Sequence, residues 1–334
     1  MVKAIPLVSI VITSFNRAQW IGKAIESALA QDYSNLEIVV SDNCSTDGSH
    51  EVIQAYTKDP RIKYSRQDVN IGMLPNFKKA SEELAAGEYI SFLSSDDYFT
   101  YPKFISDAVQ LVNNYPDVVI VFGKGQDLDD VTKKIRKDQT DFYKVEFRKG
   151  QEAFLEMVNE DLSFAGIFFR RNTFVSLDVF SHVGISGLDV LANLTMMLHG
   201  NAAYIDKYCY MMRHHQNNAH NRLSAEFYIN ELKIINIPYE NAIKSELIET
   251  HKLEKWHTDI LVRFITIFFR RLYLSNRQEF VLFSSYIKKF YEPIFRTIDD
   301  DRTWKRYKMF YRYPSLTYNP LRYVWNLYKE IRYK

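Results

Sequence analysis

The chain has 334 residues, of which 46% are hydrophobic and 25% are charged, which is the composition of an ordinary globular protein with one large domain or two smaller ones. The 43 basic and 41 acidic residues leave a net charge of +2, which excludes a chain-wide electrostatic grip on nucleic acid. Two cysteines, Cys44 and Cys209, predict neither a disulfide framework nor a zinc site and fit a cytoplasmic protein. The longest apolar run of the second half, 259–274, is interrupted by arginines, so we expect no membrane-spanning helix.

The first 125 residues alternate strand-like and helix-like segments, the pattern of a parallel sheet covered by helices. The expected strands lie at 7–13, 36–41 and 61–66 and in the stretch 87–99. The expected helices lie at 18–31, from about 49, and at 75–87; the segment 103–123 adds a helix and a strand. From about residue 150 the rhythm changes, with expected helices at 150–160 and 188–200 and a strand at 202–215 that complete the same domain. Beyond about residue 222 the period is helical throughout, which predicts a separate helical module.

The last part of this module, 302–334, is rich in basic and aromatic residues and has Glu330 as its one acidic residue after Arg302. Cationic and aromatic side chains together are typical of contact with an anionic membrane surface, here the inner face of the cell membrane. The alternative is a solvated basic helix whose aromatic side chains pack on the domain or on a partner subunit, so oligomerisation stays open. An RNA-binding function is less favoured because no recognition module accompanies the segment.

Polar residues follow the predicted strands, in "TSFNR", "SDNCSTDGS" and "SSDDYF". Ligands of an open parallel sheet bind outside the carboxyl ends of its strands, so Asp42, Asp47, Asp96 and Asp97 are expected at one edge. Adjacent carboxylates repel each other unless a cation or a shifted pKa intervenes, and Asp96 with Asp97 therefore indicates Mg²⁺ or Mn²⁺ that shares its open positions with a diphosphate. The alternative for this pair is a turn or a helix cap.

Two stretches carry a resemblance to a known family: "VSIVITSFNRAQWIGKAIESALAQDYSNLEIVVSDNCSTDGS" and "NIGMLPNFKKASEELAAGEYISFLSSDDYF". In order and spacing they resemble the inverting family 2 glycosyltransferases, and weaker similarity continues through "GLDVLANLTMMLHG" and "YMMRHHQNNAHN". The resemblance implies the GT-A fold, a Rossmann-like and mostly parallel α/β sheet flanked by helices. It implies a catalytic domain at 1–221, with a nucleotide-sugar half at about 1–125 and an acceptor half at about 126–221, before the helical module at 222–334.

The resemblance also assigns roles to individual positions. Asp42 matches the aspartate that binds the base, and the positions that contact the nucleotide sugar are Ser14, Phe15, Asn16, Asp42, Asn70, Gly72, Asn76, Ser95 and Asp96. The implied metal ligands are Asp96, Asp97 and His215, with His214 or Arg213 as alternatives for the diphosphate contact. Asp189 matches the catalytic base, although the residues alone favour a helix cap there. The chain departs from the family pattern at Thr13, where a proline is usual, and at Ser94, which replaces the first aspartate of the metal motif.

We therefore predict an enzyme that transfers a sugar, with inversion, from a nucleotide-diphosphate sugar, which we expect to be a UDP-sugar. The predicted acceptor is a hydroxyl of a glycan or lipid-linked molecule, as in bacterial polysaccharide assembly. A nucleotidyltransferase is disfavoured because no glycine-rich phosphate loop follows the first strand. The alternative from a different class is a non-catalytic scaffold or glycan-binding partner of a synthase complex, since Ser94 removes one carboxylate.

Overall fold

The computed structural model describes residues 5–137, 141–157, 164–182, 184–215 and 224–300. The chain divides into two compact units, and each is described by itself. The first falls within Met1–Val183, Gly187–Asn218 and Lys244–Ile248, and the second within Gly184–Ser186, Ala219–Ile243 and Glu249–Lys334. The predicted domain boundary at 221 and the basic, aromatic segment 302–334 lie outside the described residues, so both stay predictions.

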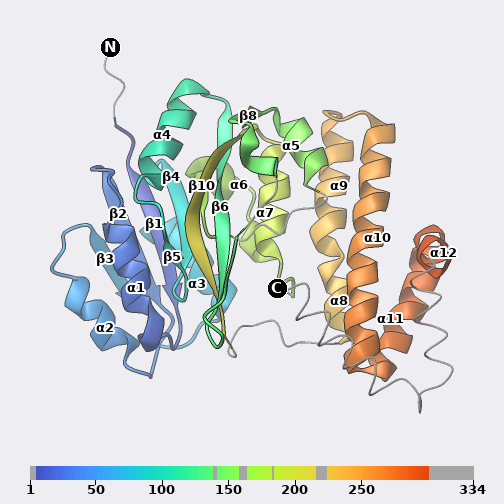
Figure 1. The fold of residues 1–334 in the computed structure, drawn as a ribbon, viewed down its shortest axis with the longest axis horizontal. Helices are drawn as coiled ribbons and strands as arrows, with labels where there is room; N and C mark the ends of the chain where they lie inside the picture. The colour runs from blue at the N-terminus through green and yellow to red at the C-terminus, as the bar shows by residue number, and fades with distance from the viewer. Residues whose placement is uncertain (1–4, 138–140, 158–163, 183, 216–223, 301–334) are drawn as a thin grey trace. The chain divides into compact units, whose positions relative to one another are not determined.

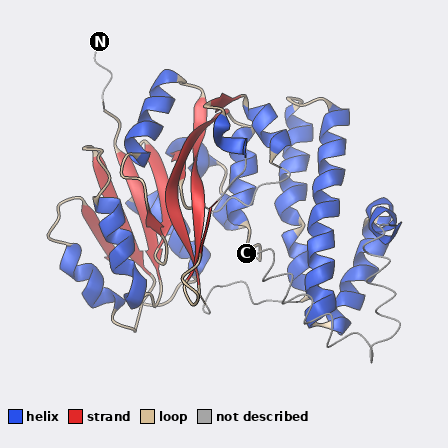
Figure 2. Cartoon of the chain, viewed as in Figure 1, coloured by secondary structure: helices blue, strands red, loops and turns tan. Residues whose placement is uncertain are grey.

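The first unit is built on one mixed sheet with helices on both of its faces (Figures 1 and 2). Its strands are β1 (Val8–Ser14), β2 (Leu36–Asp42), β3 (Ile62–Arg66), β4 (Tyr89–Ser94), β5 (Tyr98–Phe99), β6 (Val118–Asp129), β7 (Ile135–Lys137), β8 (Phe147–Arg148), β9 (Ile167–Arg170) and β10 (Asn201–His214). Its helices are α1 (Ala18–Leu29), α2 (Ser49–Tyr56), α3 (Met73–Lys79), α4 (Phe104–Asn114), α5 (Gly150–Glu156), α6 (Arg171–Ser176) and α7 (Leu188–Met197), with short η1 (Ala80–Leu84), η2 (Asp141–Lys144) and η3 (Val179–Ser181).

The strand order is β3-β2-β1-β4-β9-β6-β10-β5, with β7 beside β6 and β8 beside β10. The strands β3, β2, β1 and β4 run parallel to one another, and β6 runs parallel to β10, while β9 pairs antiparallel with both β4 and β6. A strand that is buried on both faces reads as a continuous apolar run, and every residue of β2 is buried. The predicted mostly parallel α/β sheet is therefore confirmed.

The core lies on both sides of this sheet. On one face, alternate residues of β1 such as Ile10 pack with buried residues of α1 and α4, including Ile21 and Phe104. On the other face, an aromatic cluster brings the ring of Phe92 on β4 within 5.2 Å of Phe174 on α6. Successive side chains of a strand point to opposite faces of the sheet, so each strand contributes apolar side chains to the core on both faces.

Two segments differ from their expected form. The helix expected at 75–87 begins at Met73 and changes from α3 to the π-helical η1 at Ala80, well before Gly87. The strand β6 continues to Asp129 and pairs with β7 as a hairpin that the sequence did not indicate. The paired residues of this hairpin are mostly polar, half-buried on β6 and exposed on β7, so they lack the apolar pattern by which a strand is recognised.

Glu37 on β2 is a buried carboxylate that supports the sheet. It accepts hydrogen bonds from Ser9 Oγ at 2.5 Å and from the backbone N–H of Ala86 at 2.7 Å, and it pairs with Lys63 Nζ at 2.5 Å. Burial alone would raise the pKa of Glu37, but these donors outweigh it and hold the pKa below the ordinary value of 4.5.

Glu37→Gln is therefore expected to flatten the dependence of stability on acid pH. A carboxylate whose pKa is lower in the folded state stabilises the fold above its unfolded pKa, and this contribution is lost as pH falls through the folded value. Urea unfolding at pH 7 and below pH 4.5 measures the difference. The matched control is Glu83→Gln at an exposed position of η1; equal pH slopes for both variants would contradict the assignment.

The second unit is helical, as predicted for the C-terminal part. It contains α8 (Ala225–Glu231), α9 (Lys233–Ser245), α10 (Thr250–Ser275), α11 (Arg277–Phe290) and α12 (Glu292–Asp300). Its core is aromatic, and Tyr228 stacks on Phe268 with 4.4 Å between the ring centroids. Within the residues described, no helix has both the length and the apolar character needed to cross a membrane.

Candidate active site

The loops that follow β1, β2 and β4 meet at the carboxyl edge of the sheet. The parallel register aligns Ser14 with Asp42 and Thr13 with Ser94. The backbone N–H of Asn43 donates to the carbonyl oxygen of Ser14 at 2.8 Å, which continues the pairing one residue beyond the strands. The polar segments were predicted to meet at this edge because the carboxyl ends of parallel strands lie on the same side of a sheet.

The loop after β1 is bonded to the loop after β2 at several points. Asn16 has a left-handed backbone with φ of 53°; its N–H donates to Ser45 Oγ at 2.9 Å, and its side-chain Oδ1 accepts from the N–H of Thr46 at 2.8 Å. The N–H of Ala18, the first residue of α1, donates to Asp47 Oδ2 at 3.0 Å. A left-handed conformation is costly for a residue with a Cβ, so these bonds maintain a strained turn.

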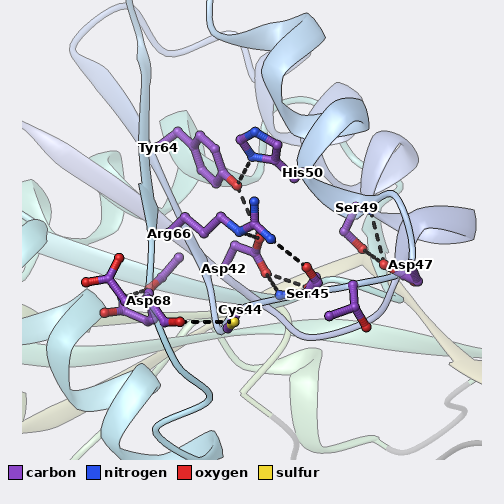
Figure 3. A network of polar contacts seen from close by, with 12 residues as sticks. Asp42, Cys44, Ser45, Asp47, Ser49, His50, Tyr64, Arg66 and Asp68 are labelled. Carbon is purple, nitrogen blue, oxygen red and sulfur yellow. Dashed lines mark hydrogen bonds and ion pairs between the residues drawn. The ribbon is translucent and has the colours of Figure 1, made fainter.

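Asp42 is fully buried at the end of β2 and has four donors around it (Figure 3). Its Oδ1 accepts from the N–H of Ser45 at 3.0 Å and from Ser45 Oγ, and its Oδ2 accepts from the hydroxyl of Tyr64 at 3.2 Å and pairs with Arg66 Nε at 3.5 Å. His50 Nδ1 contacts the same hydroxyl at 2.8 Å. Burial and the charge of Asp42 raise the pKa of Tyr64, which keeps the hydroxyl protonated as a donor.

Asparagine side chains order the next loop, between β3 and α3. Asn70 Oδ1 accepts hydrogen bonds from Asn43 Nδ2 and from the N–H of Gly72, both at 2.9 Å. Gly72 has φ of 93°, a conformation that glycine adopts readily. Asn76 is buried and its amide is bonded to Ser41, with Ser41 Oγ donating to Oδ1 at 2.7 Å and Nδ2 donating to the Ser41 carbonyl at 3.1 Å. Asn70 and Gly72 thus line the loop, whereas Asn76 fastens α3 to β2.

Asp96 faces two groups from other parts of the chain. Its Oδ2 lies 2.9 Å from Nε2 of His215, which follows β10, and 3.4 Å from Nε of Arg17, which precedes α1. The imidazole of His215 stacks on the indole of Trp20, with 4.2 Å between ring centroids and 16° between planes. The sequence predicted Asp96 and His215 as metal ligands, and the structure brings these two together.

Asp97 has a different environment. Its side chain is buried, and Oδ1 accepts a hydrogen bond from the backbone N–H of Arg213 at 2.8 Å. Burial, followed by the neighbouring charge of Asp96, raises the pKa of the Asp97 carboxyl, and the Arg213 N–H opposes the rise. This hydrogen bond joins the turn after β4 to β10, and a metal-binding role for Asp97 stays a prediction.

The donor set suits a hard divalent cation in part. Within the described residues no group of three or more His, Cys, Asp or Glu side chains could hold a metal ion. Asp96 Oδ2 and His215 Nε2 nevertheless lie 2.9 Å apart in a hydrogen bond, and a cation bound to both would take the place of the proton that they share. A carboxylate oxygen and an imidazole nitrogen fit Mg²⁺ or Mn²⁺ if a diphosphate and water complete the coordination.

Asp189 comes from a separate element, the first turn of α7. Its Oδ1 accepts a hydrogen bond from the backbone N–H of Val190 at 2.9 Å, and its side chain is half buried. A carboxylate in the first turn also suits the partial positive charge of a helix N-terminus. Asp189 is thus the second residue of α7, and Gly187 holds the cap position, so the structure does not show the helix cap that the residues alone favoured. The catalytic role of Asp189 stays a prediction.

The remaining predicted contacts lie at the same edge. Ser14 Oγ is buried and has no hydrogen-bond partner among the described residues. Phe15 is 41% exposed, and Ser95 is buried. Arg17, Trp20 and Arg66 contact the predicted site residues but were not predicted from the sequence. For Arg17, the available signal was its position directly after Asn16 in "SFNR".

Comparison with known proteins places the chain in a family. The model of the family described as "Glycosyl transferase family 2" matches residues 9–175. The Escherichia coli UDP-Glc:alpha-D-GlcNAc-diphosphoundecaprenol beta-1,3-glucosyltransferase WfaP is 38% identical over 97 residues, which are 29% of this chain and 38% of that protein. The chain spans between 21% and 40% of the length of the first curated relatives it matches.

Solved structures show the same fold. The structure of S. aureus TarS 1-349 in complex with UDP-GlcNAc has a TM-score of 0.62 and 19% identity, and the match covers 86% of this chain and 78% of that one. The mannosyltransferase PcManGT from Pyrobaculum calidifontis, in complex with GDP-Man and Mn²⁺, has a TM-score of 0.50 and 16% identity over 94% of this chain and 89% of that one. The GT-A-like fold predicted from the sequence is confirmed, and the chain belongs to glycosyl transferase family 2.

Proposed function

We propose that this chain transfers a sugar from a UDP-sugar to a hydroxyl of a glycan or lipid-linked acceptor, with inversion at the anomeric carbon. The observation that carries the proposal is the pairing of Asp96 with His215 beside the ordered loops after β1 and β2. WfaP is named for a UDP-Glc donor and a diphosphoundecaprenol-linked acceptor, and TarS was solved with UDP-GlcNAc, which supports the donor and acceptor classes.

Each group has one task in the proposed reaction. The loop around Asp42 and Asn70 binds the nucleoside, and Ser14 Oγ, which is buried without a partner among the described residues, lies at the same edge of the sheet. Asp189 takes the proton of the acceptor hydroxyl as the oxygen bonds to the anomeric carbon, while the bond from that carbon to the phosphate oxygen breaks and its electron pair leaves with the diphosphate. A single displacement inverts the centre and needs one base.

The diphosphate gains negative charge as it leaves. Asp96 and His215, with Asp97 proposed as a further ligand, would hold a divalent cation, whose positive charge would stabilise the leaving diphosphate. Arg17 lies 3.4 Å from Asp96 and adds a guanidinium at the same place. We further propose that residues 1–125 bind the donor and 126–221 contribute the acceptor side of the catalytic domain.

The second candidate is a non-catalytic scaffold or glycan-binding partner, which Ser94 favours because a family carboxylate is absent there. Binding of nucleotide separates the two. UDP with Mn²⁺ at about 100 times its dissociation constant is expected to stabilise the protein by about 2.7 kcal/mol and raise the melting temperature by several degrees. GDP, dTDP and ADP are tested in parallel. Stability unchanged by every nucleotide would favour the scaffold.

Turnover is measured next, with UDP-, GDP- and dTDP-sugars scored by released nucleotide. The proposal expects release from a UDP-sugar that increases when an acceptor glycan or lipid-linked acceptor is added. Release from a GDP-sugar alone would overturn the donor assignment while leaving the reaction class in place.

A further inference from the structure

We propose that Trp20 is a positioning residue that holds the imidazole of His215 against Asp96. This inference rests on the proposed function, since it concerns the cation and diphosphate site of the same reaction. The indole and imidazole rings are stacked, with centroids 4.2 Å apart and planes 16° apart. A ring held flat against another can still slide or turn in its own plane, and the bond from Nε2 to Asp96 at 2.9 Å fixes that remaining freedom.

Trp20 is itself fixed by the start of α1. Its backbone N–H donates to the carbonyl oxygen of Arg17 at 2.9 Å, and the N–H of Arg17 donates to Ser49 Oγ, also at 2.9 Å. The next residue, Ala18, is held by Asp47. The first turn of α1 is therefore tied to the loop after β2, and Trp20 is 9% exposed within it.

The same indole also meets Arg17. The guanidinium carbon of Arg17 lies 5.7 Å from the Trp20 ring centroid, within the range of a cation–π contact. Trp20 thus contacts both groups that approach Asp96 Oδ2, namely His215 on one side and Arg17 on the other. The His215 side chain is 6% exposed, so little solvent surrounds the imidazole and packing decides its orientation.

The stacking face matters here, and the indole nitrogen does not. Trp20 Nε1 is buried and has no hydrogen-bond partner among the described residues. Trp20→Phe keeps an aromatic face and removes no hydrogen bond, whereas Trp20→Leu keeps an apolar side chain and removes the face. Outer-shell groups that orient a metal ligand change metal affinity by about 10- to 100-fold when they are mutated.

The test is Mn²⁺ binding to the full chain by calorimetry with saturating UDP. Trp20→Leu is expected to weaken Mn²⁺ binding about 10- to 100-fold, and Trp20→Phe by less than about threefold. UDP binding without metal, measured on the same samples, is expected to change less than about twofold. The Trp20 ring stacks on His215 and lies beside Arg17, whereas the proposed nucleoside site is the loop around Asp42 and Asn70. The matched control is Trp256→Leu, which removes another buried tryptophan, in α10.

A double-mutant cycle with His215→Gln separates positioning from general support of the fold. If Trp20 acts through the imidazole, Trp20→Leu adds less than about twofold to the loss already caused by His215→Gln. The positioning role would be overturned if Trp20→Leu lowered Mn²⁺ affinity by the same factor whether residue 215 is histidine or glutamine. It would also be overturned if Trp20→Leu bound Mn²⁺ with wild-type affinity. If the wild type and Trp20→Leu bind UDP and Mn²⁺ equally well, only the inference about Trp20 fails. If the wild type binds neither UDP nor Mn²⁺, both the proposed function and this inference fail.

Discussion

Asp189→Asn is expected to lower sugar transfer by about 10²- to 10⁴-fold while nucleotide binding stays close to wild type. Asparagine has the same shape as aspartate, and its side-chain oxygen can still accept the hydrogen bond from the N–H of Val190 at the start of α7. It cannot take the proton of an acceptor hydroxyl at neutral pH. The loss should therefore fall on kcat, with the binding of UDP and Mn²⁺ unchanged by calorimetry.

The matched control for Asp189→Asn is Asp107→Asn. Asp107 is also an acidic residue in a helical first turn of the same unit, where it accepts a hydrogen bond from the hydroxyl of Tyr101 at 2.9 Å. Its amide is expected to keep turnover within about threefold, because the amide oxygen can still accept the hydrogen bond from Tyr101 and Asp107 has no proposed role in the reaction. Turnover at the wild-type rate in Asp189→Asn would show that another group is the base. Loss of nucleotide binding in that variant would indicate a structural role instead.

Asp96→Asn is expected to remove most of the Mn²⁺ dependence of both UDP binding and turnover. The amide is a poorer ligand and carries no charge to balance a divalent cation, so the diphosphate loses its stabilisation as it leaves. We expect turnover to fall by about 10²- to 10³-fold, the loss typical of removing one electrostatic contact to a developing charge. Titration of turnover with Mn²⁺, together with calorimetry, measures both effects.

A neighbouring pair supplies the control for this second variant. Asp127 Oδ1 lies 2.9 Å from His214 Nε2, the same separation as between Asp96 and His215 one residue further along the chain. Asp127→Asn therefore removes an equivalent aspartate–histidine contact, and it is expected to leave Mn²⁺ affinity within about threefold of wild type. Equal losses from both variants would mean that the cation is not held specifically at Asp96.

The parts of the fold that could be predicted are those with a local pattern. The strands β1, β2 and β4 are largely apolar runs followed by polar turns. The bounds expected for β1 and β2 differ from those found by one residue, and β4 lies within the stretch 87–99 that was expected to contain it. The position of β9 was not predictable, because a four-residue apolar strand carries no information on which neighbours it will pair with. Its antiparallel insertion between β4 and β6 depends on long-range contacts.

The site divides in the same way. Asp96 could be proposed because two carboxylates in sequence are unusual after a strand, but its contact with His215 joins residues 119 positions apart. Trp20 has the spacing of a core residue on an amphipathic helix, and nothing in that spacing shows that its ring faces an imidazole. The resemblance supplied the residues at the sheet edge, whereas their partners required the structure.

If Asp42 binds the base as proposed, its existing contacts affect how tightly the nucleotide is held. A carboxylate offers about four acceptor positions; Ser45 and Tyr64 fill three of them with hydrogen bonds, and Arg66 Nε forms an ion pair at 3.5 Å beside the fourth. A base bound to this carboxylate would compete with Arg66, the most solvent-accessible and most distant of these groups, whose Nη2 also donates to the Ser45 carbonyl at 2.8 Å. Replacing one polar contact of the carboxylate by another would gain little free energy, so the proposed site would release a spent nucleotide readily after each reaction.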